Sequence, residues 1–115
     1  MFVDESLRAH EHPGIGFRAG PTGRRAAVAG GPDVWEVIAA LHAVQGESVE
    51  LDGAALLAEL SAVTGLAVEQ VRTALRYYAA YPDEIDERVT ANSEAADRAE
   101  RLWRAERRLL EGRRQ

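Results

Sequence analysis

Histidine and cysteine are the residues most often used for catalysis and metal binding, and this sequence offers little of either. His10 and His12 form an H-x-H pair without further ligands nearby, and His42 lies in a helical segment with no neighbouring histidine. Cysteine is absent, which excludes a thiolate metal site and a catalytic thiol. The glycines form no phosphate-binding loop, and no serine–histidine–aspartate grouping stands out. We therefore expect no catalytic residue, no metal and no cofactor, and interpret the protein as a binding protein.

The strongest local pattern is that of a helix-turn-helix unit in residues 57–75. Such a unit needs a small residue where the helices cross, a glycine in the turn, and apolar residues that pack the second helix on the first. These requirements are met by Ser61, Gly65, Leu66, Val71 and Leu75. The alternative is an ordinary helical hairpin with a glycine corner.

The second helix of this unit carries the candidate DNA contacts. These are Gln70, Arg72, Thr73 and Arg76. Ala67 is a poor N-cap, and Glu69 faces phosphates unfavourably unless it accepts a hydrogen bond from a cytosine amino group. The net charge of −5 argues against strong non-specific DNA binding. A solvated face of an ordinary helix is the alternative.

The composition changes at Pro82. Residues 82–115 contain nine acidic and eight basic residues, which predicts a long charged amphipathic helix or a disordered tail that becomes one. Four large apolar residues share one helical face: Leu102, Trp103, Leu109 and Leu110. The arginines around them are Arg98, Arg101, Arg104, Arg107 and Arg108. These nine residues are the candidate partner-binding surface, because a helix docks into a groove through such anchors.

Turn residues and apolar spacing predict the elements before this tail. We expect a hairpin over residues 13–28, with its turn at residues 20–23. A helix should follow, with Pro32 at its first position, Asp33 and Glu36 in its first turn and its end near Val44, and then a brief extended segment around Val49 and Leu51. Two further helices should run from an N-cap at Asp52 to Gly65 and over residues 67–81.

The fold class is therefore mainly α: an N-terminal β-hairpin, a helix-turn-helix core and a long C-terminal amphipathic helix. We divide the chain into a core domain, residues 1–81, and a partner-binding tail, residues 82–115. A short hairpin leaves open strand edges and the core is thin, so we expect a homodimer with Ile15, Phe17 and Val28 at its interface. No signal sequence or membrane span stands out, so the expected compartment is the cytoplasm.

Several runs in the chain resemble one family of small bacterial proteins. The most specific is ALRYYAAYPDEIDE at residues 74–87, followed by Asn92. Weaker matches are HPGI at residues 12–15, DVWEVI at 33–38, TGL at 64–66 and QVR at 70–72. With these runs the chain resembles VapB-like antitoxins of type II toxin–antitoxin systems, a helix-turn-helix family long catalogued as a domain of unknown function.

The resemblance implies a homeodomain-like DNA-binding core and a PIN-like ribonuclease toxin as partner. The expected function is then neutralisation of that toxin by direct binding, with autoregulation of the operon through operator DNA. The alternative is a stand-alone helix-turn-helix transcription regulator without a toxin. The neighbouring open reading frame would discriminate between the two.

Overall fold

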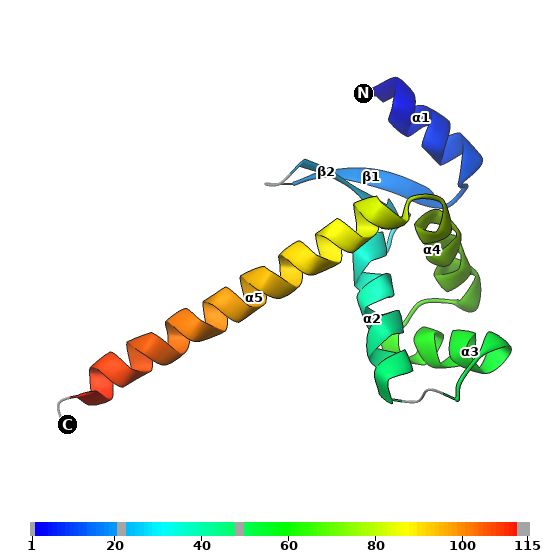
Figure 1. The fold of residues 1–115 in the computed structure, drawn as a ribbon. Coiled ribbons are helices and arrows are strands. Elements are labelled where there is room, and N and C mark those ends of the chain that lie inside the picture. Colours follow the sequence, from blue (N-terminus) through cyan, green and yellow to red (C-terminus); the bar gives the residue numbers. More distant parts are fainter. Residues whose placement is uncertain (1, 21–22, 48–49, 113–115) are drawn as a thin grey trace.

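The computed structural model describes residues 2–20, 23–47 and 50–112, and it is mainly helical (Figure 1). Its elements are α1 (Phe2–Glu11), β1 (Ile15–Gly20), β2 (Gly23–Val28), α2 (Val34–Glu47), α3 (Gly53–Thr64), α4 (Val68–Ala80) and α5 (Pro82–Glu111). The predicted fold class, a hairpin followed by helices and a long C-terminal helix, is confirmed.

The hairpin packs its own apolar residues into the core. Strands β1 and β2 are antiparallel, and Ile15 pairs with Val28 while Phe17 pairs with Ala26. Ile15 and Val28 are buried, and Phe17 is partly buried and packs against the core. The expected dimer interface is therefore corrected for Ile15 and Val28, because the chain itself covers both side chains. The tip residues Pro21 and Thr22, at the predicted turn, lie outside the described residues.

Helix α2 differs from its prediction at both ends. Asp33 is the residue before the helix, and its backbone N–H donates to Glu36 Oε2 at 3.0 Å in the manner of a capping box. Pro32 therefore precedes the helix and does not occupy its first position. At the other end α2 passes through Gly46 to Glu47, since Val44 is buried and holds the last turns on the core.

Helices α2, α3 and α4 pack against one another to form the core. Its largest fully buried side chains are Tyr77, Ile38, Leu60, Val34, Val37 and Val71. Gly65 ends α3 in a left-handed conformation with φ 78°, as predicted. Asp52 occupies the predicted N-cap position, but its side chain makes no capping hydrogen bond. The expected extended segment falls partly on Ser48 and Val49, which lie outside the described residues.

Helix α1 is an element that the sequence patterns did not predict. Four of its ten residues are charged and Leu7 is 55% exposed, so burial of Leu7 contributes little to holding it. Ion pairs fasten it instead: Arg24 of β2 donates to Glu5 at 2.7 Å, and Arg8 donates to Glu84 of α5 at 2.6 Å. These ion pairs attach α1 to β2 and to α5, which are distant from it in sequence.

Helix α5 projects from the core as a rod (Figure 1). Thirty residues correspond to a helix about 45 Å long. Ile85 is buried and Val89 packs on the core, but every residue from Thr90 to Arg104 is exposed. The Cα radius of gyration is 17.7 Å, against about 13 Å for a compact chain of this length. The first two turns of α5 thus pack on the core, and residues 90–104 are exposed to solvent among the residues that the structure describes.

Candidate macromolecule-binding surfaces

The unit formed by α3 and α4 has helix-turn-helix geometry. The two helices bend by 105° at the turn between Thr64 and Val68, within the range of such units. The Ser61 hydroxyl donates to the Leu66 carbonyl at 2.5 Å, and Gly65 N–H donates to the Ser61 carbonyl at 2.9 Å. Ser61 is therefore more than a small residue at the crossing, because its hydroxyl also closes the turn.

Two of the four predicted DNA contacts are used within the chain. Gln70 Oε1 accepts a hydrogen bond from Ala67 N–H at 2.9 Å, which is the half of a capping box that the residue at N3 provides. Thr73 lies against the loop before β1, where a Cβ added to Gly14 would come within 3.1 Å of its Cγ2. Gln70 and Thr73 are therefore half-buried and lie beside the exposed face of α4.

Arg72 and Arg76 project from the exposed side of α4, one turn apart. Together with Glu69 they form what we call the α4 face; Arg76 lies 3.6 Å from the Glu69 carboxylate. The two arginines border an apolar hollow of about 330 Å³ that α3 and α4 form with Leu56, Leu57 and Leu75. Their stems can cover this hollow while the guanidinium groups stay in water. The α4 face therefore presents two cations, one of them partly balanced by a carboxylate.

The second surface is the outer half of α5. The four predicted anchors are all exposed: Leu102 by 65%, Trp103 by 54%, Leu109 by 79% and Leu110 by 74%. We call these four residues the distal stripe. Their spacing of one and seven residues places them on one face of the helix. A helix segment whose large apolar residues all face solvent, as in this outer half of α5, has a surface suited to a partner.

The arginines of α5 differ in their surroundings. Arg104 donates to Glu100 at 2.7 Å and Arg107 donates to Glu111 at 3.2 Å, both i,i+4 pairs. Arg107 also lies over the Trp103 ring, 5.1 Å from its centroid. Arg98 precedes Leu102 by one turn and thus shares the face of the distal stripe. Arg101 and Arg108, which complete the predicted set, are exposed as well.

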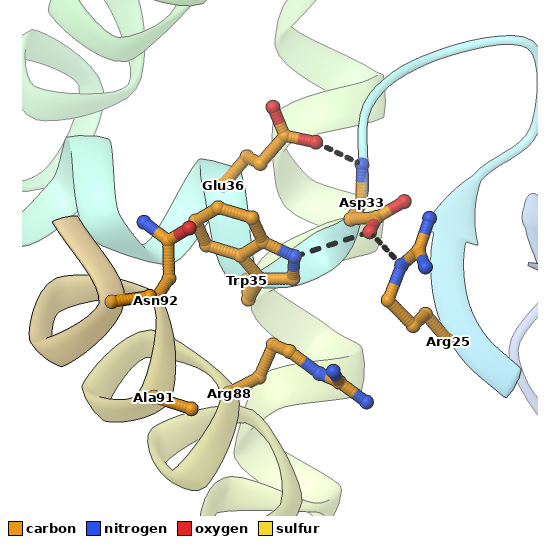
Figure 2. A pocket seen from close by; sticks show the side chains of 8 residues that line it. Arg25, Asp33, Trp35, Glu36, Arg88, Ala91 and Asn92 are labelled. Carbon is orange, nitrogen blue, oxygen red and sulfur yellow. Dashed lines mark hydrogen bonds and ion pairs between the residues drawn. The ribbon is translucent and has the colours of Figure 1, made fainter. Parts of the chain in front are cut away.

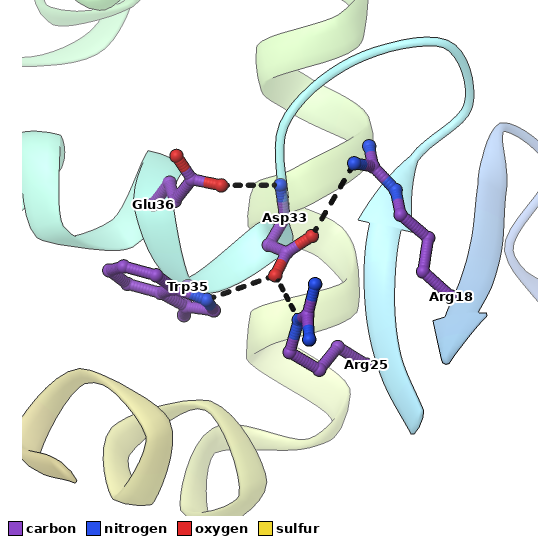
Figure 3. A network of polar contacts seen from close by, with 5 residues as sticks. All are labelled: Arg18, Arg25, Asp33, Trp35 and Glu36. Atoms are coloured by element: carbon purple, nitrogen blue, oxygen red, sulfur yellow. Dashed lines mark hydrogen bonds and ion pairs between the residues drawn. The ribbon is translucent and has the colours of Figure 1, made fainter. Parts of the chain in front are cut away.

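A buried carboxylate, Asp33, joins the hairpin to α2 (Figure 3). Asp33 Oδ2 accepts from Arg25 Nε at 2.5 Å and from Trp35 Nε1 at 3.1 Å. Its second oxygen, Oδ1, lies 3.9 Å from Arg18 Nη1. Sequence analysis assigned Asp33 to the helix start and missed this role. The available signal was one arginine in each predicted strand, Arg18 and Arg25, followed by Asp33 two residues before Trp35.

A pocket of about 390 Å³ lies beside this cluster, where α5 leaves α2 (Figure 2). One wall carries Arg25, Asp33, Trp35 and Glu36, and the α5 wall carries Arg88, Ala91, Asn92 and Ala95. Asp33 directs Oδ2 toward Arg25 and Trp35, and its ion pairs stay within the chain. The pocket is therefore a notch between two helices and contains no convergent catalytic groups.

A second polar cluster joins α1, α4 and α5 at Tyr77. The Tyr77 hydroxyl accepts from Arg8 at 2.9 Å and donates to Glu84 at 3.0 Å. Burial raises the pKa of the Tyr77 phenol, and the Glu84 charge raises it further, against the opposing effect of Arg8. Arg8 also stacks over the Tyr81 ring, 4.0 Å from its centroid. The cluster fastens α1 and is structural in character.

The histidines show no metal-binding arrangement. His12 packs edge-on against Tyr77 and Tyr81, with ring centroids 5.5 Å and 5.9 Å apart. In the part of the chain that the structure describes, no three histidine, aspartate or glutamate side chains are placed to hold a metal ion. Within the same residues, no single helix has the length and apolar character needed to cross a membrane.

No family model, no curated protein and no solved structure matches this chain. The α4 face and the distal stripe are therefore the observations that bear on its function.

Proposed function

We propose that the protein is a cytoplasmic antitoxin that neutralises a PIN-like ribonuclease through α5 and binds operator DNA through α4. The observation that carries the proposal is the exposed outer half of α5 with its distal stripe. The resemblance of residues 12–92 to type II antitoxins supplies the class of partner.

A partner for α5 is expected on energetic grounds. Helices in water gain most of their stability from packing, and an unpacked segment of about twenty residues is marginal by itself. The two i,i+4 pairs, Glu100–Arg104 and Arg107–Glu111, contribute only about 0.3–0.5 kcal/mol each. Burying the distal stripe against a partner gains about 25 cal/mol of free energy per Å² of apolar surface removed from water. This gain stabilises the helical conformation of the outer half of α5. A groove on the nuclease would provide that cover.

The chemistry of inhibition follows from the arginines. A PIN-like site is a cluster of carboxylates that holds a metal ion through oxygen ligands. A guanidinium group can pair with such carboxylates through two parallel hydrogen bonds and so compete with the metal. Among the α5 arginines Arg98 is best placed, because it shares the face of the distal stripe, whereas Arg104 is paired with Glu100. The apolar anchors would provide affinity, and Arg98 would occupy the site.

The Arg98→Ala variant is expected to inhibit the nuclease at least about tenfold less well than the native chain, since a desolvated charged pair is worth more than 1.4 kcal/mol. Arg104→Ala is the matched control and should change inhibition less than about threefold, because Arg104 pairs with its own helix. Inhibition constants measured with the product of the adjacent gene test this. Equal effects of both variants would contradict the assignment of Arg98.

DNA binding by the α4 face is the second half of the proposal. Removing both cations in Arg72→Ala/Arg76→Ala should lower affinity for the chain's own upstream region about tenfold or more, and reduce the salt slope by about two. Arg101→Ala/Arg104→Ala removes the same charge from α5 and is the control. Gel shifts at several salt concentrations provide the measurement. A native chain that binds no DNA, alone or with the nuclease, would leave only the partner-binding role.

A stand-alone transcription regulator is the second candidate, and the helix-turn-helix geometry with Arg72 and Arg76 exposed favours it. The neighbouring open reading frame discriminates between the candidates. A nuclease gene beside this one supports the antitoxin, and an unrelated metabolic operon supports the regulator.

A further inference from the structure

Side-chain size and charge are both segregated along α5. The inner half carries small residues on the exposed part of its face, Ala91, Ala95 and Ala99, and the outer half carries the distal stripe. Residues 82–97 contain six carboxylates and one arginine, whereas residues 98–112 contain five arginines and three glutamates. The helix is therefore small and acidic near the core and large and basic at its far end.

The small and the large residues lie on the same face. Ala95, Leu102 and Leu109 are seven residues apart, and Ala91 and Ala99 flank Ala95 at four residues on either side. This face includes the α5 wall of the notch beside Trp35 (Figure 2). The pairs Glu100–Arg104 and Arg107–Glu111 are salt bridges within the helix; the first lies away from this face, and Arg107 borders it, over the Trp103 ring. One seam thus runs from the notch to the end of α5, with one carboxylate on it, Glu106, between Leu102 and Leu110.

We propose that this seam binds a second copy of the chain, with the two α5 helices antiparallel. In that arrangement Leu102 and Trp103 of each copy lie level with residues 91–92 of the other copy, beside Ala91 and Ala95, and the arginine-rich outer half of each helix lies along the carboxylate-rich inner half of the other. A parallel pair would instead place arginines beside arginines and large residues beside large residues. Size and charge therefore select the same orientation.

The arrangement is a closed two-fold dimer. A two-fold axis midway between Ala95 and Ala99 relates the two seams, so each copy gives and receives the same contacts. Trp103 of one copy then lies level with Ala91 of the other, at the notch of about 390 Å³ lined by Trp35. The notch receives a large aromatic side chain, which is the usual anchor of an interface.

This inference goes beyond the proposed function, because self-association needs no nuclease. The two proposals are linked in one respect, since the second copy and the nuclease would cover the same face. The dimer is then the form of the free chain, and the nuclease would have to displace one copy to bind the distal stripe.

Light scattering on the native chain at tens of micromolar tests the association. The native chain should have the mass of a dimer, and Leu102→Ala/Trp103→Ala should weaken the dimer at least about thirtyfold. Glu100→Ala/Arg104→Ala, on the polar side of the same helix, should leave the dimer within about threefold of the native chain. A monomeric native chain overturns the proposal, as does a dimer that Leu102→Ala/Trp103→Ala leaves intact.

Distances between spin labels test the orientation, and the lack of cysteine in the sequence allows single labels. Glu111→Cys and Asp97→Cys place a label at the far end of α5 and near the proposed axis. With a rise of 1.5 Å per residue, the antiparallel dimer predicts about 40 Å or more between the labels at residue 111 and about 25 Å at residue 97, which lies near the axis but on the outer side of the helix pair. Short distances at both positions indicate a parallel pair and overturn the antiparallel arrangement.

Discussion

Replacing Tyr77 with alanine is expected to lower the free energy of unfolding by about 4 kcal/mol, the cost of removing a large buried aromatic side chain. Tyr77 is fully buried, and its ring contacts Phe17 of β1 and Tyr81 at centroid distances of 6.3 Å and 4.7 Å. The cavity therefore opens where the hairpin, α1, α4 and α5 meet. The total free energy of unfolding of a domain of this size is about 5–15 kcal/mol. The melting temperature should therefore fall by more than about 10 °C.

Tyr77→Phe is the matched control, because it keeps the ring and removes only the hydroxyl. Arg8 and Glu84 remain paired at 2.6 Å, so we expect a loss of about 1 kcal/mol. The two variants also differ in pH dependence. The pKa of Tyr77 is raised in the folded chain, so its contribution is present below the ordinary tyrosine pKa near 10 and declines above it. Tyr77→Phe should lack that part of the alkaline decline in urea titrations, and equal destabilisation by both variants would contradict the role of the ring.

Local patterns in the sequence were sufficient to predict the hairpin, the helix-turn-helix unit and the long C-terminal helix. Each of these depends on residues a few positions apart: the alternation around Ile15 and Phe17, the glycine at Gly65, and the spacing of the distal stripe. Such patterns act through the periodicity of the backbone, which the sequence displays directly. The exposed apolar face of α5 could be predicted for the same reason.

Contacts between distant residues could not be predicted in this way. The pairing of Arg8 with Tyr77 and Glu84 spans 69 and 76 positions, and it is what holds α1 in place. Thr73 likewise faces the Gly14 loop because of how α4 packs against the hairpin. Nothing in the residues near Thr73 indicates that neighbour. Of the four residues predicted to contact DNA, Arg72 and Arg76 therefore lie on the open side of α4, whereas Gln70 and Thr73 contact other parts of the chain.

A chain that ends at Asn92 is expected to fold and to lose all measurable inhibition of the nuclease. Ile85 and Val89, which join α5 to the core, remain in this shortened chain. The residues removed up to position 104 are all exposed, so the melting temperature should stay within a few degrees of the native value. The distal stripe and the five arginines at positions 98–108 are lost together. If the stripe provides the main anchors, the affinity should fall at least about a thousandfold.

The control for this shortened chain is the full-length Leu102→Ala/Trp103→Ala/Leu109→Ala/Leu110→Ala variant, which keeps every charge of α5 and removes only the stripe. Both chains should fail to rescue growth when the adjacent gene is co-expressed, whereas Glu100→Ala/Arg104→Ala should rescue it. Loss of rescue in both chains would assign affinity to the apolar anchors, while rescue by the full-length variant alone would assign it to the arginines. Rescue by the chain that ends at Asn92 would show that neutralisation lies in the core, and the proposed role of α5 would then be wrong.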